Sequence, residues 1–90
     1  MMFSTAEISR LIEGVGLNPK RRPLNESTDL FDDGFLDSIS VIQLVTKCEE
    51  VFDITFDFKD LTKANFLSVA TLTALLRDKY KVAFGENSDV

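Results

Sequence analysis

Apolar residues recur at helical spacing in three separate segments of the chain. Residues 4–15, 38–52 and 68–80 each place apolar side chains three and four positions apart, so that these side chains share one helix face. The apolar faces comprise Ile8, Leu11, Ile12 and Val15 in the first segment, Val41, Leu44, Val45, Cys48 and Phe52 in the second, and Val69, Leu72, Leu75, Leu76 and Tyr80 in the third. The pattern predicts three amphipathic helices packed around one apolar core.

Residues that favour helix ends support these boundaries. Asp37 and Ser68 directly precede the second and third apolar patterns, and their side-chain oxygens can accept hydrogen bonds from the N–H groups of a first helical turn. The negative charge of Asp37 also suits the positive end of a helix dipole. Gly14 and Gly16 end the first pattern, and Pro19 prevents its resumption.

A long connection covers residues 16–37. It contains two prolines and the basic run Lys20-Arg21-Arg22, and a connection of this length within a small domain is often functional. We expect its apolar residues to anchor it on the helices; they are Leu24, Leu30, Phe31, Phe35 and Leu36.

Residues 54–58 alternate apolar and polar side chains, which taken alone is a strand pattern. The chain offers no second strand to pair with it, and one strand is not stable by itself. We therefore expect an extended loop that inserts Ile54, Phe56 and Phe58 into the core, followed by a short helix near residues 58–63.

These elements predict an all-α fold, a four-helix bundle of three longer helices and one short helix with a long loop between the first two. Ninety residues are enough for one domain, which would span residues 1–90. We expect an ordered core at about residues 4–81 and a frayed tail at residues 82–90.

The composition excludes several kinds of chemistry. The chain has no histidine and a single cysteine, Cys48, so we expect no disulfide, no metal site and no serine–histidine or cysteine–histidine couple. Because Cys48 falls on the apolar face of the second helix, we expect it in the core. The chain has no long apolar run and no signal-peptide pattern, which predicts a cytoplasmic protein without membrane insertion.

Negative charge is concentrated in the middle of the chain. The whole chain carries a net charge of −5, whereas residues 26–60 hold ten acidic residues against two lysines. Such a segment repels nucleic acid and favours basic protein surfaces, although charges also serve simply to keep a surface solvated. We expect a monomer that binds proteins and does not bind nucleic acid.

One serine occupies a distinctive position. An acidic turn containing Gly34 leads into Asp37-Ser38, and the second helical pattern begins at once. This order places the hydroxyl of Ser38 at the exposed start of a helix. Without histidine the serine is a poor nucleophile, but it is accessible to another enzyme that modifies it.

The residues around Ser38 resemble the modification site of acyl and peptidyl carrier proteins. The similarity includes Leu-Phe-Asp-Asp-Gly-Phe-Leu before Asp37-Ser38 and Ile-Ser-Val-Ile-Gln-Leu after it. It continues at the end of the second helix and at the entry to the last one, in residues 49–54 and 65–72. The resemblance thus covers about residues 5–80, nearly the whole domain.

The resemblance implies a carrier without catalytic activity. Ser38 would be esterified to 4′-phosphopantetheine, taken from coenzyme A by a separate magnesium-dependent phosphopantetheinyl transferase. Asp37 would cap the helix and lie beside the site of the transferase's metal. The phosphodiester would face the N–H groups that open the second helix, a favourable position for an anion. The arm's thiol would hold an acyl or aminoacyl group as a thioester, loaded by a ligase and passed to a downstream transferase or synthase.

Four further residues of the second helix are candidates for partner docking. Ile39 and Ile42 lie off its apolar face, close to Ser38. Glu49 and Glu50 lie near its far end, where the helix dipole disfavours negative charge. Since folding does not explain that acidic pair, we expect these four residues to contact partner enzymes.

Two departures from the pattern of bacterial fatty-acid carriers bear on the cargo. Those carriers usually have acids where this chain has Ser40 and Gln43. The neutral residues resemble those of discrete aminoacyl carriers, including D-alanyl carriers, or carriers of polyketide, nonribosomal peptide or modified fatty acid pathways. A housekeeping fatty-acid carrier and, from another class, an unmodified acidic interaction module stay as alternatives. A hydrolase is disfavoured, because the chain lacks histidine and a Gly-x-Ser-x-Gly motif.

Overall fold

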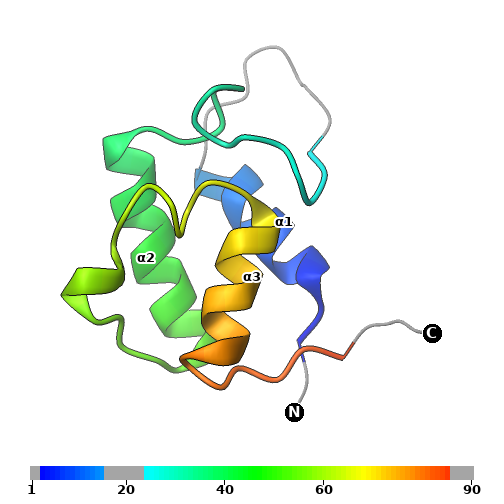
Figure 1. Ribbon diagram of the computed structural model, residues 1–90, viewed down its shortest axis with the longest axis vertical. Helices are drawn as coiled ribbons and strands as arrows, with labels where there is room; N and C mark the ends of the chain where they lie inside the picture. The colour runs from blue at the N-terminus through cyan, green and yellow to red at the C-terminus, as the bar shows by residue number, and fades with distance from the viewer. Residues whose placement is uncertain (1–2, 16–23, 86–90) are drawn as a thin grey trace.

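The structure is a computed structural model that describes residues 3–15 and 24–85, and its regular elements in those ranges are helical (Figure 1). They are α1 (Thr5–Val15), α2 (Ser38–Phe52), the 3₁₀ turn η1 (Phe58–Asp60) and α3 (Val69–Asp78). The three helices predicted from the apolar periodicity are confirmed within two residues at each end. The fold is therefore all-helical, although the predicted short fourth helix is a single 3₁₀ turn.

One apolar core joins the helices and the connections between them. Helix α1 packs against both α2 and α3, and the faces predicted from the spacing supply the centre of the core: Ile8, Ile12, Leu44, Cys48, Leu72 and Leu76 are fully buried. The long connection adds Leu30, Phe35 and Leu36, as expected, while Leu24 and Phe31 are half-buried. The basic run and Pro19 lie outside the described residues. None of the helices in the described ranges has the length and apolarity that crossing a bilayer requires.

The segment between α2 and α3 differs from the expectation at one aromatic residue. Phe56 is buried and Ile54 is half-buried, but 88% of Phe58 is exposed, so the prediction that Phe58 enters the core is wrong. Asp57 caps η1 by accepting a hydrogen bond from the backbone N–H of Lys59. The strand-like alternation of side chains therefore stops at Asp57, and the 3₁₀ turn directs Phe58 outward.

The chain beyond α3 also differs from the expectation. Val82 is buried, and Phe84 forms an isolated parallel bridge with Phe3, so the first and last described residues lie side by side (Figure 1). The rings of Phe3 and Phe84 contact Phe52 edge-on, with centroid distances of 4.8 Å and 5.9 Å. The prediction of a frayed tail is therefore wrong for its first residues, and the rest of the tail lies outside the described ranges.

Candidate functional site

An acidic turn precedes α2, and the side chain of Asp29 stabilises it. The carboxylate of Asp29 accepts hydrogen bonds from the backbone N–H groups of Phe31, at 3.1 Å, and Asp32, at 2.9 Å. Gly34 follows with φ at +82°, a backbone conformation that side chains disfavour and glycine adopts freely. The turn therefore depends on Asp29, just before the sequence motif, and on Gly34 within it.

Backbone hydrogen bonds and burial fix this turn on the bundle. The N–H of Leu36 donates to the carbonyl of Leu30 at 2.9 Å, and the N–H of Leu30 donates to the carbonyl of Leu67, just before α3, at 2.8 Å. Phe35 is completely buried inside the loop. The approach of the chain to Ser38 is thus set by contacts with a segment that lies far away in sequence.

Asp37 is the N-cap of α2, as the sequence predicts. Its backbone is extended, and its Oδ1 accepts a hydrogen bond from the N–H of Ser40 at 2.8 Å. The hydrogen bonds from the backbone and side chain of Ser40 lower the pKa of the Asp37 carboxyl from its ordinary value. The carboxylate is therefore ionised at neutral pH and adds negative charge at the mouth of the helix.

Ser38 is the first residue of α2 and is exposed, whereas the side chain of Ser40 is buried. The exposed hydroxyl stands at the positive end of a helix of 15 residues, where a phosphodiester is stabilised by backbone N–H groups and the helix dipole. An accessible hydroxyl and a helix N-terminus are the features that a phosphate-linked arm needs. The local structure fits such a group.

Cys48 cannot serve as the thiol of a carrier. It is fully buried, as predicted, and burial together with the neighbouring charge of Glu49 raises the pKa of its thiol to about 12. The sulfur is therefore neither accessible nor ionised at neutral pH. Because Cys48 is the single cysteine of the chain, a thioester needs a thiol that is added to the protein.

The structure separates the four predicted docking residues into two groups. Ile39 and Ile42 are 68% and 67% exposed in the first turns of α2, next to Ser38. Glu49 and Glu50 lie eleven and twelve residues beyond Ser38, or roughly 16–18 Å along the helix axis. The structure thus brings the isoleucines, but not the glutamates, close to the candidate attachment site.

Glu49 has a role inside the molecule. Its Oε2 accepts a hydrogen bond from the backbone N–H of Phe56 at 2.9 Å and so ties α2 to the segment that follows it. Folding therefore explains this charge, and the reason for assigning Glu49 to a partner is removed. Glu50 is exposed.

Two further apolar residues are exposed outside α2. Phe58 and Leu61 are 88% and 37% exposed on η1 and at its end. The sequence contains a signal for the position of Phe58, because Asp57 is a favourable N-cap for a turn that starts at the next residue. The alternating pattern of residues 54–58 conceals that signal.

The sequence pattern of one protein family, described as the phosphopantetheine attachment site, matches residues 7–76. The chain belongs to this family. Its prosthetic group is accordingly 4′-phosphopantetheine, and the family carries acyl groups without catalysing their reactions. No curated protein sequence matches this carrier protein significantly.

A solved structure is similar to the carrier over most of its length. It is the crystal structure of Bradyrhizobium japonicum glycine:[carrier protein] ligase complexed with glycylated carrier protein. The matched chain is 27% identical, the TM-score is 0.69, and the match covers 79% of the present chain and 95% of the other. The neighbouring protein is thus a carrier seen with its aminoacyl ligase.

Proposed function

We propose that the Ser38 hydroxyl bears 4′-phosphopantetheine and that the arm carries a thioester-bound aminoacyl or acyl group in a specialised pathway. The single observation that supports this most is the exposed Ser38 at the first position of α2, beside the ionised cap Asp37. On modification, a bond forms between the serine oxygen and phosphorus while the pyrophosphate bond of coenzyme A breaks. The hydroxyl proton leaves to the transferase, and the nucleotide part of coenzyme A is released.

An aminoacyl cargo, loaded by a ligase, is the version of this function that we favour. The similarity to a glycylated carrier protein in complex with a glycine ligase supports it. The exposed, neutral Gln43 also supports it, because that position lacks the acid usual in fatty-acid carriers. Ser40 supports it less than the sequence suggested, since its side chain is buried and does not belong to the contact face.

We further propose that Ile39 and Ile42 form the apolar part of the surface that meets the transferase, the loading ligase and the downstream acceptor enzyme. Both side chains are exposed beside Ser38, so a partner that reaches the serine must cover them. Glu50 adds charge further along α2, and Phe58 is an additional exposed contact. On the sequence arguments above, the proposed site of action is the cytoplasm.

Intact mass tests the attachment directly. Incubation with coenzyme A, magnesium and a broad-specificity phosphopantetheinyl transferase is expected to add one phosphopantetheinyl group to the wild type and none to Ser38→Ala. Ser27→Ala is the matched control, because it removes another exposed hydroxyl and is expected to be modified normally. A wild type that gains no mass would favour the unmodified interaction module, and a modified Ser38→Ala would move the attachment to another residue.

A further inference from the structure

An apolar group on an arm at Ser38 has two possible environments. It can stay in water, or it can enter the core if a segment that covers the core moves aside. Residues 54–68, here called the crossing segment, join α2 to α3 and contribute the buried rings of Phe56 and Phe66 to that core. The contacts that hold the crossing segment therefore decide whether the bundle admits a chain-like cargo.

A buried face of the crossing segment packs into the core. Phe56 and Phe66 are 8% and 0% exposed, and their ring centroids lie 5.9 Å apart. The ring of Phe56 also contacts that of Tyr80, beyond α3, edge-on at 5.1 Å. A well-packed core has little free volume, so an alkyl chain could enter only by displacing such side chains.

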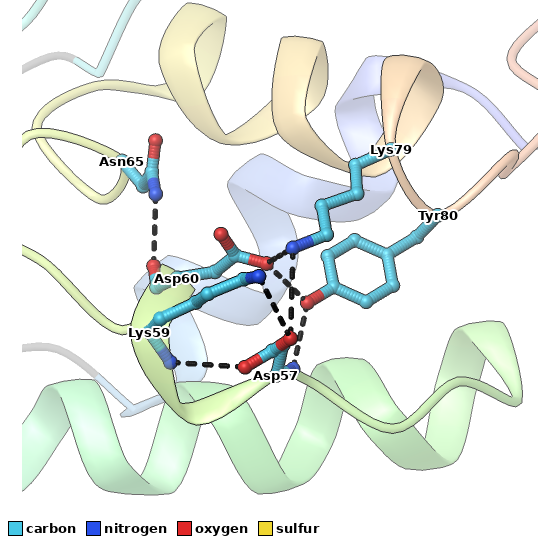
Figure 2. Close-up of polar contacts among 6 residues, drawn as sticks. All are labelled: Asp57, Lys59, Asp60, Asn65, Lys79 and Tyr80. Atoms are coloured by element: carbon cyan, nitrogen blue, oxygen red, sulfur yellow. Dashed lines mark hydrogen bonds and ion pairs between the residues drawn. The ribbon is translucent and has the colours of Figure 1, made fainter.

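A polar cluster fixes the same segment to the chain after α3 (Figure 2). The phenolic hydroxyl of Tyr80 donates to Oδ2 of Asp60 at 2.6 Å and accepts from the backbone N–H of Asp57 at 2.7 Å. The ammonium group of Lys79 pairs with the same Asp60 carboxylate and lies 3.8 Å from the Asp57 carboxylate. We call these four residues the latch.

The latch is more than a pair of solvated surface charges. The Asp60 side chain is only 14% exposed, and it receives hydrogen bonds from two different donors. The side-chain amide of Asn65 donates to the backbone carbonyl of Asp60 at 2.9 Å, which fixes the turn itself. On the other side, Glu49 of α2 accepts from the N–H of Phe56. The crossing segment is thus bound to α2 at its start and to the end of α3 at its middle.

We propose that the latch keeps the bundle closed, so that the cargo stays outside it and the carrier suits small polar acyl groups such as aminoacyl groups rather than long alkyl chains. Opening the bundle would break charge-assisted hydrogen bonds and expose Phe56 and Phe66 together. A small polar group gains nothing from burial and needs no such opening. This inference rests on the proposed attachment of the arm to Ser38.

The test compares two cargoes on the same arm. The transferase is supplied with acetyl-coenzyme A or octanoyl-coenzyme A, and intact mass confirms each loaded form. The melting temperature and the rate of thioester cleavage by hydroxylamine are then measured. For the wild type we expect the octanoyl and acetyl forms to have the same melting temperature and the same rate of thioester cleavage, since neither cargo is buried.

The variants that open the latch are Tyr80→Phe, which removes one hydroxyl, and Asp60→Asn. In both we expect the octanoyl form to melt above the acetyl form, by on the order of 5 °C, and to be cleaved more slowly. Asp78→Asn is the matched control, because it removes an exposed carboxylate next to the latch that pairs with Arg77, and it should behave as the wild type.

Three results are distinguishable. A wild type stabilised by octanoyl, with slowed cleavage, would overturn the closed bundle but leave the carrier function intact. Latch variants that fold, as judged by circular dichroism, but show no octanoyl effect would overturn the role of the latch. A wild type that accepts neither cargo on Ser38 would contradict the proposed function itself.

Discussion

Tyr80 donates a hydrogen bond to the carboxylate of Asp60 across 20 residues of sequence, with 2.6 Å between Oη and Oδ2. Lys79 and Tyr80, as hydrogen-bond donors, lower the pKa of Asp60 from its ordinary value of 3.8. Burial, and then the contact with Asp60, raises the pKa of Tyr80. The position of the crossing segment is thus linked to the ionisation of one carboxyl group.

That link predicts how stability depends on pH. Since the folded state lowers the pKa of Asp60, the stabilisation is complete above the unfolded value near 3.8 and is lost as pH falls through the folded value. We expect the free energy of unfolding to fall more steeply below pH 4 in the wild type than in Asp60→Asn. Urea unfolding at a series of pH values measures the difference, and parallel curves would contradict the prediction. Other acids, such as Asp37, contribute equally to both proteins and cancel.

The two roles of Asp37 are separable by substitution. Asp37→Ala is expected to lower the melting temperature, because the N–H of Ser40 loses its acceptor. Asp37→Asn retains a capping oxygen and should melt close to the wild type. If the charge also serves the transferase, both variants should be modified more slowly at Ser38, as followed by intact mass. Normal modification of Asp37→Asn would restrict Asp37 to the capping role.

Truncation of two apolar residues of α2 should have very different effects on stability. Leu44 is fully buried, so Leu44→Ala is expected to cost about 2–5 kcal/mol of unfolding free energy. Ile42 is 67% exposed on the same helix, and Ile42→Ala should stay within about 0.5 kcal/mol of the wild type. Chemical denaturation of the two variants checks this, and comparable losses would place Ile42 in the core.

Ile39 provides the test of docking. Ile39→Asp is expected to slow modification by the transferase, because a charge then enters the apolar surface beside Ser38. Its melting temperature should remain near that of the wild type, since 68% of the side chain is already exposed. A large drop in melting temperature would show instead that Ile39 stabilises the fold. An unchanged modification rate would remove Ile39 from the contact with the transferase.

The helices and the exposed position of Ser38 at the start of α2 are predictable from the sequence because their signals are local. Asp37 and Ser68 cap α2 and α3 as expected, and Ser68 forms a capping box with Thr71. The apolar spacing placed Leu44 and Cys48 in the core without any knowledge of what they contact. Such features depend on residues within one or two turns of each other, which a single sequence displays directly.

The remaining features depend on contacts that a sequence does not display. The sequence places Tyr80 only on the apolar face of the last helix, whereas its pairing with Asp60 exists because the fold brings two distant turns together. No neighbouring residue in the sequence explains the negative charge of Glu49 near the end of α2, whereas in the fold it accepts a hydrogen bond from the N–H of Phe56. After α3, Lys81 adopts φ of +61°, unusual for a residue with a side chain. No local signal in the sequence predicts that turn, which leads Val82 and Phe84 back onto the bundle.

The burial of Cys48 has a practical consequence for anyone who handles this protein. The single thiol of the chain is buried and protonated. A maleimide dye should therefore not label the folded protein before phosphopantetheine is attached. Once an arm has been installed, its terminal sulfur becomes the one group that the dye can reach. Fluorescence in a gel band would then count occupied carriers without any engineered tag.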